Sequence, residues 1–169
     1  LSANEQTLSP TEPPFWFFEL DAGFHYYQRY YLRGHEVHGK LRNITFDGWS
    51  TESIVIDYDP DQGSCLWVVE QGDQLVKTLP ALTRAGLPMS DLSRISRSES
   101  DQGGQIPALF GDEIAHTWCY YFQKAELARQ FQDWEQVLAL AEEVERKGHE
   151  PQNRFEWRPF VDAYLHMGQ

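Results

Sequence analysis

Two cysteines, Cys65 and Cys119, are the residues whose chemistry limits this chain most directly. They lie far apart and form no CxxC pair, so a zinc site of the usual ligand spacing is excluded. Two alternatives remain from the residues alone. The cysteines are either two buried free thiols, or they form one disulfide that joins the two halves of the chain and requires an oxidising compartment.

Two short clusters resemble metal ligands, but both lack necessary parts. Asp57, Asp59 and Asp61 alternate as in a calcium loop, yet the glycine comes one position late and a valine occupies the twelfth position. His35 and His38 would share one side of a helix, but no third ligand follows nearby. We therefore predict an acidic turn and two exposed histidines, with no metal and no cofactor.

The sequence contains no recognisable catalytic motif. The serines between Ser90 and Ser100 have no GxSxG around them, and Gly103-Gly104 lacks the strand before it and the lysine after it that a phosphate loop needs. No pair of the 26 acidic residues is singled out for acid–base work. We predict no catalytic residue and expect the chain not to be an enzyme.

Aromatic residues make up 14% of the chain and are the remaining candidates for function. Aromatic side chains suit either a rigid core or a contact surface. One interpretation is that they cover the sheet and helices; the other is a surface for a protein or carbohydrate partner. The residues proposed for that surface are Trp16, Phe18, Tyr27, Tyr31, Trp157 and Tyr164.

The net charge of −12 argues against nucleic acid as a partner. Binding a phosphate backbone needs a basic stripe, and the sequence has no cluster of lysine or arginine. An anionic membrane surface is disfavoured for the same reason. No run approaches the roughly 18 apolar residues of a membrane helix, so we expect no direct membrane insertion by this chain. Because it begins at Leu1, we expect either a removed leader or a fragment of a longer protein.

The sequence divides into a flexible lead-in (residues 1–14), an aromatic and β-rich lobe (15–110) and a helical lobe (111–169). A short helix is predicted from Asp21, with a strand as the alternative. Three strands are predicted between residues 40 and 70, with Asp47-Gly48 as a turn signal. Residues 71–110 lose periodicity and predict a long loop. The predicted fold class is α+β, a small antiparallel sheet of about three or more strands packed against the helices.

The last third carries the clearest pattern. Apolar residues at helical spacing predict one helix through WCYYFQKAELARQF and a second that begins at the N-cap Asp133. Gly148 and Pro151 end the second helix, and a third is predicted from about Arg154. Ala125 lies on the apolar side of the first helix, and Val137 belongs to the apolar stripe of the second. We expect both side chains to be buried.

This hairpin resembles a tetratricopeptide repeat. The repeat has small residues where its helices cross and a proline near its end, which Ala125 and Pro151 match. Gln132 stands in place of the turn glycine, and Val137 stands where alanine is usual. Fewer than two repeats are visible. Since repeats bury their faces on neighbours, the hairpin is expected to pack on the rest of the chain or on a partner.

A wider resemblance covers roughly Leu41 to Gly168. The motifs TESIVIDYDP, SCLWVVE, LPMSDLSRI, HTWCYYFQKAELARQFQDWEQV and EWRPFVDAYLHMG look like the C-terminal soluble region of uncharacterised multi-pass bacterial membrane proteins, some with a layout similar to sugar transferases. The resemblance implies a domain on the extracytoplasmic face of a bacterial membrane, with a cytoplasmic location as the alternative. An oxidising location in turn favours a Cys65–Cys119 bridge.

Together these observations predict a non-catalytic interaction or accessory domain that binds a protein partner or a membrane-embedded neighbour. One alternative is a carbohydrate-handling accessory domain of a membrane sugar transferase, suggested by the aromatic density and the resemblance. Another is a structural assembly subunit, suggested by the incomplete repeat.

Overall fold

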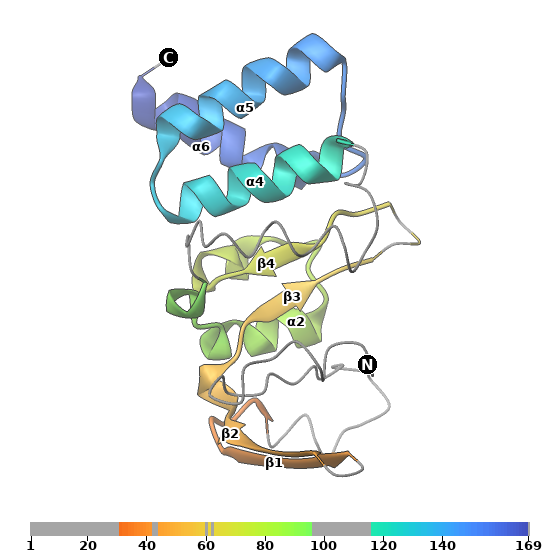
Figure 1. Cartoon of the computed structure of the whole chain (residues 1–169), viewed down its shortest axis with the longest axis vertical. Coiled ribbons are helices and arrows are strands. Elements are labelled where there is room, and N and C mark those ends of the chain that lie inside the picture. Colours follow the sequence, from red (N-terminus) through yellow and green to blue (C-terminus); the bar gives the residue numbers. More distant parts are fainter. Residues whose placement is uncertain (1–30, 42–43, 60, 62, 96–115, 169) are drawn as a thin grey trace. The chain divides into compact units, whose positions relative to one another are not determined.

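A computed structural model of the chain describes residues 31–41, 44–59, 61, 63–95 and 116–168 (Figure 1). The lead-in predicted for residues 1–14 and the start of the helix predicted from Asp21 lie outside these ranges. The chain divides into two units, Leu1–Val55 with Val69–Arg94 and Ile56–Val68 with Ile95–Gln169. The short segment Ile56–Val68 therefore belongs to the same unit as the C-terminal helices.

The predicted α+β class is confirmed. The described strands form two separate two-stranded sheets, β1 with β2 and β3 with β4, instead of one sheet of three strands. The strands are β1 (Glu36–Leu41), β2 (Ile44–Trp49), β3 (Val55–Asp57) and β4 (Trp67–Val69). The α-helices are α2 (Ala81–Gly86), α4 (Trp118–Gln130), α5 (Trp134–Lys147) and α6 (Arg158–Met167).

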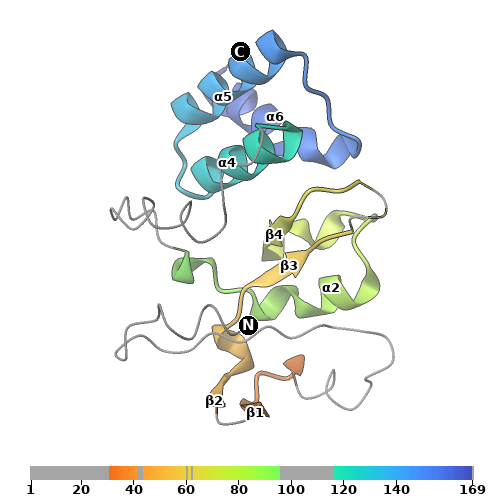
Figure 2. The ribbon, with the colours of Figure 1, turned by 45° about the vertical axis from the view of Figure 1, so that its right-hand side comes forward.

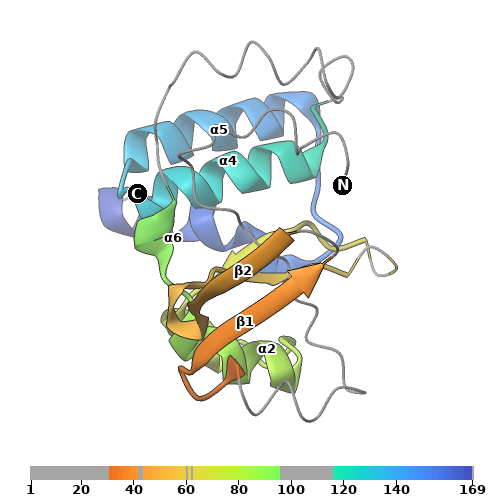
Figure 3. The same ribbon diagram turned by 60° about the horizontal axis from the view of Figure 1, so that its bottom comes forward.

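Strands β1 and β2 form an antiparallel hairpin, visible side by side in Figure 3. The predicted turn at Asp47-Gly48 is wrong, because both residues lie within β2 and pair with His38 and Val37 of β1. The physical reason is a cross-strand contact: His38 Nδ1 lies 2.6 Å from Asp47 Oδ1. This pairing outweighs the local turn preference of an Asp-Gly dipeptide.

The 3₁₀ turn η2 (Ser50–Glu52) follows β2 in the chain, and Ser90 connects Val55 of β3 with Val69 of β4, three residues of the first unit. Its hydroxyl donates to the carbonyl of Val69 at 2.6 Å and accepts from the amide of Val55 at 3.1 Å. Ser90 also forms a parallel bridge with Ser53. One serine therefore satisfies backbone groups on both strands, which is a structural role.

The segment after β4 is more regular than the predicted loop. Between residues 71 and 94 it contains helix α2 and the 3₁₀ turns η4 (Gln71–Leu75), η5 (Leu87–Met89) and η6 (Leu92–Arg94). Leu79 and Leu87 are buried, which attaches the segment to the core of the first unit. Four short elements of three to six residues carry too few turns to give a periodic signal in the sequence.

Local capping residues set the ends of the helices in the helical unit. The Asp133 side chain accepts a hydrogen bond from the Gln136 amide at 3.1 Å and caps α5. Gly148 ends α5 in the left-handed conformation at φ 65°, and Gly168 ends α6 at φ 71°. Pro159 lies in the first turn of α6, where its missing N–H is tolerated. The predicted boundaries of the second helix are therefore confirmed. The third helix differs, because residues 154–157 form the 3₁₀ turn η8 and α6 begins only at Arg158.

Helices α4 and α5 pack as a hairpin, and α6 contacts both (Figures 2 and 3). Ala125 and Val137 are fully buried, as the sequence predicts. Small and branched residues at the crossing let the two backbones approach closely. Further buried side chains of this unit include Tyr121, Phe122, Val144 and Phe160. Each such side chain contributes about 1.5–3 kcal/mol through burial.

Candidate functional site

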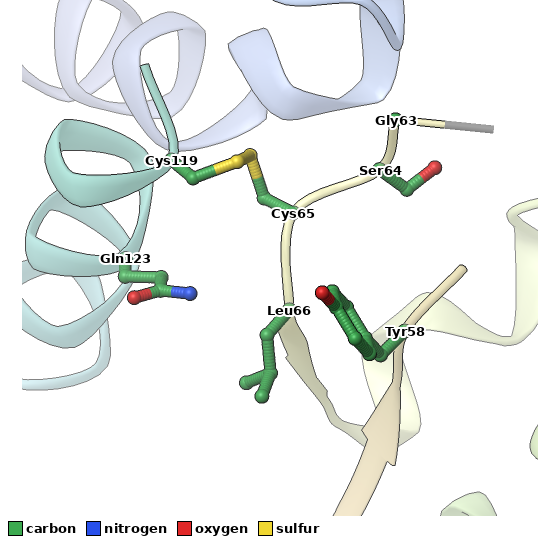
Figure 4. Close-up of a pocket in the computed structure, with 7 residues that line it drawn as sticks. All are labelled: Tyr58, Gly63, Ser64, Cys65, Leu66, Cys119 and Gln123. Atoms are coloured by element: carbon green, nitrogen blue, oxygen red, sulfur yellow. A yellow bond between two sulfur atoms is a disulfide. The ribbon is translucent and has the colours of Figure 1, made fainter. Parts of the chain in front are cut away.

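Cys65 and Cys119 form a disulfide. The free-thiol alternative is therefore wrong. The bridge connects the segment Ile56–Val68 to the first turn of α4, within one unit of the chain. Figure 4 shows it crossing from the helix to the extended residues 63–66.

An open hollow of about 530 Å³ surrounds this disulfide. It is lined by Tyr58, Gly63, Ser64, Cys65, Leu66, Cys119 and Gln123. The lining includes no histidine, carboxylate, lysine or arginine, so Ser64 has no base beside it among these residues.

Glu156 positions the same region from the other side. Its buried carboxylate accepts the Cys65 amide at 2.8 Å and the Trp118 indole N–H at 2.6 Å. Glu156 lies in η8 (Arg154–Trp157), so one side chain connects three segments of the unit. A buried carboxylate is stable only when donors satisfy its oxygens, and these two donors reach one oxygen each. No motif or spacing in the sequence indicates this role of Glu156.

A second hollow, of about 320 Å³, lies where α5 ends and α6 begins. Gly148 turns the chain there, and His149 and Glu150 follow before η8. The residues that line it combine two aromatic rings, an imidazole and two carboxylates around small residues: Ala141, Glu145, Gly148, His149, Glu150, Trp157 and Tyr164. We call this the acidic hollow.

The charges of the acidic hollow are unbalanced. The structure gives Glu145 and Glu150 no ion pair with any residue in its described ranges, and the lining contains no lysine or arginine. Neighbouring Glu143 differs, since Lys147 approaches it at 3.1 Å and Arg146 at 3.9 Å. The hollow therefore presents two carboxylates beside aromatic faces, with no lysine or arginine among the residues that line it.

Trp157 is held in a fixed orientation by the core. Its ring meets Trp118 edge-on at 4.9 Å and Phe160 at 5.8 Å, while 39% of the residue stays exposed. An aromatic ring that is packed on one side and open on the other loses little entropy when a ligand binds.

Helix α6 carries an exposed apolar stripe next to the acidic hollow. One side of the helix is buried through Phe160 and Ala163, and an adjoining side is apolar but open. The open residues recur at spacings of four, three and one. They are Trp157 at 39%, Val161 at 50%, Tyr164 at 40% and Leu165 at 73% exposure. We call these four residues the α6 stripe; its first and third members also line the acidic hollow.

Of the six residues predicted for a contact surface, the structure brings two together. Trp157 and Tyr164 line the acidic hollow. Tyr31 is half-buried and belongs to the other unit. Three more lie outside the described residues: Trp16, Phe18 and Tyr27.

The candidate metal ligands remain apart. His38 lies in β1 beside Asp47 and Glu36, and these carboxylates raise the pKa of His38, chiefly through the Asp47 hydrogen bond. His35 precedes the strand, so the two histidines do not share a helix face. Within the described ranges, no three histidine, cysteine, aspartate or glutamate side chains gather as metal ligands would.

A polar cluster links α4 to α5 and contains the other coupled groups of the helical unit. Tyr121 donates its hydroxyl to Glu143 at 3.0 Å and accepts from the Lys147 ammonium. These bonds raise the pKa of Lys147, mainly through Tyr121, and lower the pKa of Glu143, mainly through Lys147. The cluster keeps both charges in place and has a structural role at the hairpin.

Comparison with protein-family models, with curated proteins and with solved structures found no match for this chain. None of the helices in the described ranges has the length and apolar character needed to cross a bilayer.

Proposed function

We propose that this domain is a non-catalytic interaction module of tetratricopeptide type, and that the α6 stripe is its docking surface for a protein partner. The observation that carries the proposal is the exposure of Val161 and Leu165 beside two half-open aromatic residues, Trp157 and Tyr164. Contiguous exposed apolar residues on a folded helix mark interaction sites. Interface cores are also enriched in tryptophan and tyrosine.

The packing of the hairpin supports this proposal. A tetratricopeptide unit presents each helix to a following helix, and α6 corresponds to the first helix of a second unit. Its buried side contacts α4 and α5, which leaves the stripe in the position where another helix would pack. A partner helix in that position would use the helix-in-groove mode, with anchors at spacings of three and four.

Site-specific photo-crosslinking tests the docking surface. A photoreactive phenylalanine analogue is placed at Leu165 in the full chain, in cells that express it, and at Glu142, which is exposed on α5, as the matched control. We expect one discrete adduct with another protein from position 165 and none from position 142. The adduct should disappear when Val161→Glu is added. Equal labelling from both positions, or none from either, would contradict the proposal.

We also propose that the domain works on the extracytoplasmic face of a bacterial membrane, attached to a membrane protein. The Cys65–Cys119 disulfide supports an oxidising compartment. Cells are lysed in trichloroacetic acid to trap the thiol state, and the denatured protein is alkylated with a maleimide–polyethylene glycol, since bridged cysteines react only after a reductant is added. Immediate modification of both thiols would instead favour the cytoplasm.

Carbohydrate binding is a second candidate, favoured by one observation. The acidic hollow sets two aromatic rings beside two carboxylates. Rings can stack on a sugar face and carboxylates can accept its hydroxyl hydrogens. Titration with cellotriose and chitotriose, followed by calorimetry, tests this function. If neither sugar produces heat of binding at concentrations up to about 10 mM, the carbohydrate function is contradicted.

A further inference from the structure

The acidic hollow contains two carboxylates and one imidazole, that of His149, and no lysine or arginine among its lining residues. Two carboxylates, Glu145 and Glu150, face it together with the rings of Trp157 and Tyr164. Both carboxylates lack an ion-pair partner among the described residues, whereas nearby Glu143 has two cations within reach. Aromatic faces carry negative potential and attract cations over the ring, most strongly at tryptophan. The carboxylates and the aromatic rings therefore both favour a positively charged ligand.

The hollow is also continuous with the proposed docking surface, because Trp157 and Tyr164 belong to both. A ligand that covers Val161 and Leu165 with apolar side chains would place its next residues at the hollow. Apolar anchors beside a basic side chain would match both parts of the surface. An acidic segment would meet uncompensated like charge.

We infer that the acidic hollow binds a lysine or arginine side chain of the protein partner whose apolar residues cover the α6 stripe. This inference rests on the proposed docking function and specifies the chemistry of the partner. The carboxylates of Glu145 and Glu150 receive the cation, and the Trp157 ring, backed by Trp118 and Phe160, stacks on it. Arginine suits the site best, since its planar head both stacks and donates to carboxylates.

Three peptides of one length separate charge from apolar contact. The first is a fluorescein-labelled, 16-residue alanine- and leucine-based helix with leucines at spacings of three and four and arginines beside them. The second replaces each arginine with citrulline, which keeps the shape and removes the charge. The third carries glutamate in the same places. Fluorescence anisotropy with the full chain at about 50 and 300 mM NaCl gives each affinity and its salt dependence.

The arginine peptide should bind about tenfold more tightly than the citrulline peptide at low salt, and this preference should shrink at high salt. Glu145→Gln combined with Glu150→Gln should weaken the arginine peptide about fivefold, equivalent to about 1 kcal/mol, and leave the citrulline peptide unchanged. The control combines Glu135→Gln with Glu142→Gln, an equal charge change at exposed positions of α5 outside the hollow. It should retain the preference.

The outcomes distinguish this inference from the docking function on which it rests. Leu165→Glu should weaken the arginine and citrulline peptides equally, which reports on the stripe alone. Equal binding of all three peptides to the unmodified chain would overturn the cation site and leave the docking surface standing. Failure of all three would overturn the inference, while photo-crosslinking still decides the docking function. Binding of cellotriose or chitotriose that Glu145→Gln and Glu150→Gln abolish, without an arginine preference, would assign the hollow to sugar instead.

Discussion

Replacing Glu156 with glutamine tests the internal organisation of the helical unit most directly. The carboxylate is 4% exposed and accepts two hydrogen bonds, from the Cys65 amide and the Trp118 indole. Glutamine keeps the size of the side chain but has one acceptor oxygen. Its NH₂ group must therefore face one of the two donors, and that donor is left buried without an acceptor.

The magnitude follows from the two bonds. A hydrogen bond to a charged group contributes about 1.5–3 kcal/mol, and an orphaned buried donor costs about 1–3 kcal/mol. Glu156→Gln loses the charge assistance of both bonds and leaves one donor unsatisfied. We therefore expect the free energy of unfolding to fall by about 2–4 kcal/mol. The exposed Glu142→Gln control should change it by less than about 0.5 kcal/mol.

Urea unfolding followed by circular dichroism at 222 nm measures this loss, because that signal reports on the helices. A double-mutant cycle with Trp118→Phe isolates the indole bond, since phenylalanine keeps a ring but has no N–H. We expect a coupling energy of about 1–2 kcal/mol between Glu156 and Trp118. A Glu156→Gln variant as stable as the unmodified chain, or a coupling near zero, would refute the role assigned to this carboxylate.

Four further perturbations have effects that can be worked out from the structure. Reduction of the disulfide, whose cysteines are 54 residues apart, should lower the free energy of unfolding by about 4 kcal/mol through loop entropy, measured by urea unfolding with and without reductant. Gln132→Gly should raise the free energy of unfolding by about 1 kcal/mol, because Gln132 is a non-glycine residue at φ 56°; thermal unfolding measures the change. Gly148→Ala should lower the free energy of unfolding by a similar amount in the same measurement. The cause is the backbone alone, since Gly148 has φ 65° and no atom lies within 4 Å of the added methyl group. Asp47 raises the pKa of His38 in the folded state above the unfolded-state pKa of 6.5. Their contact therefore stabilises the fold fully below pH 6.5, and this stabilisation is lost as the pH rises through the raised pKa. NMR titration of His38 should show a lower pKa in Asp47→Asn.

Local signals explain why the helical unit could be predicted from the sequence. Asp133 and Gly148 act within one turn of their own helix, through a cap and a left-handed residue. The burial of Ala125 and Val137 follows from their positions on apolar helix faces. These preferences depend only on nearby residues, so the helices and their buried sides can be predicted from the sequence.

Non-local contacts explain what the sequence could not reveal. Glu156 meets the Cys65 amide across 91 residues, and nothing near Glu156 in the sequence distinguishes it from an exposed glutamate of a first helical turn. The acidic hollow is equally hidden, because Glu145 and Trp157 come together only after Gly148 has turned the chain. Aromatic type alone was enough to single out Trp157 and Tyr164, but their carboxylate neighbours had no such signal.

The α6 stripe cannot be explained by the stability of the helical unit alone. Leu165 is 73% exposed and Val161 is 50% exposed, so most of their apolar surface gains nothing from the present fold. Covering either side chain fully would contribute up to about 1.5–3 kcal/mol, which is available only to something that packs on α6. The other side of α6 is already buried through Phe160 and Ala163. At the start of α4, the indole of Trp118 donates to Glu156 and Cys119 forms the disulfide. The unit therefore holds itself together by one set of contacts and leaves exposed a separate apolar surface, the one that we propose for a partner.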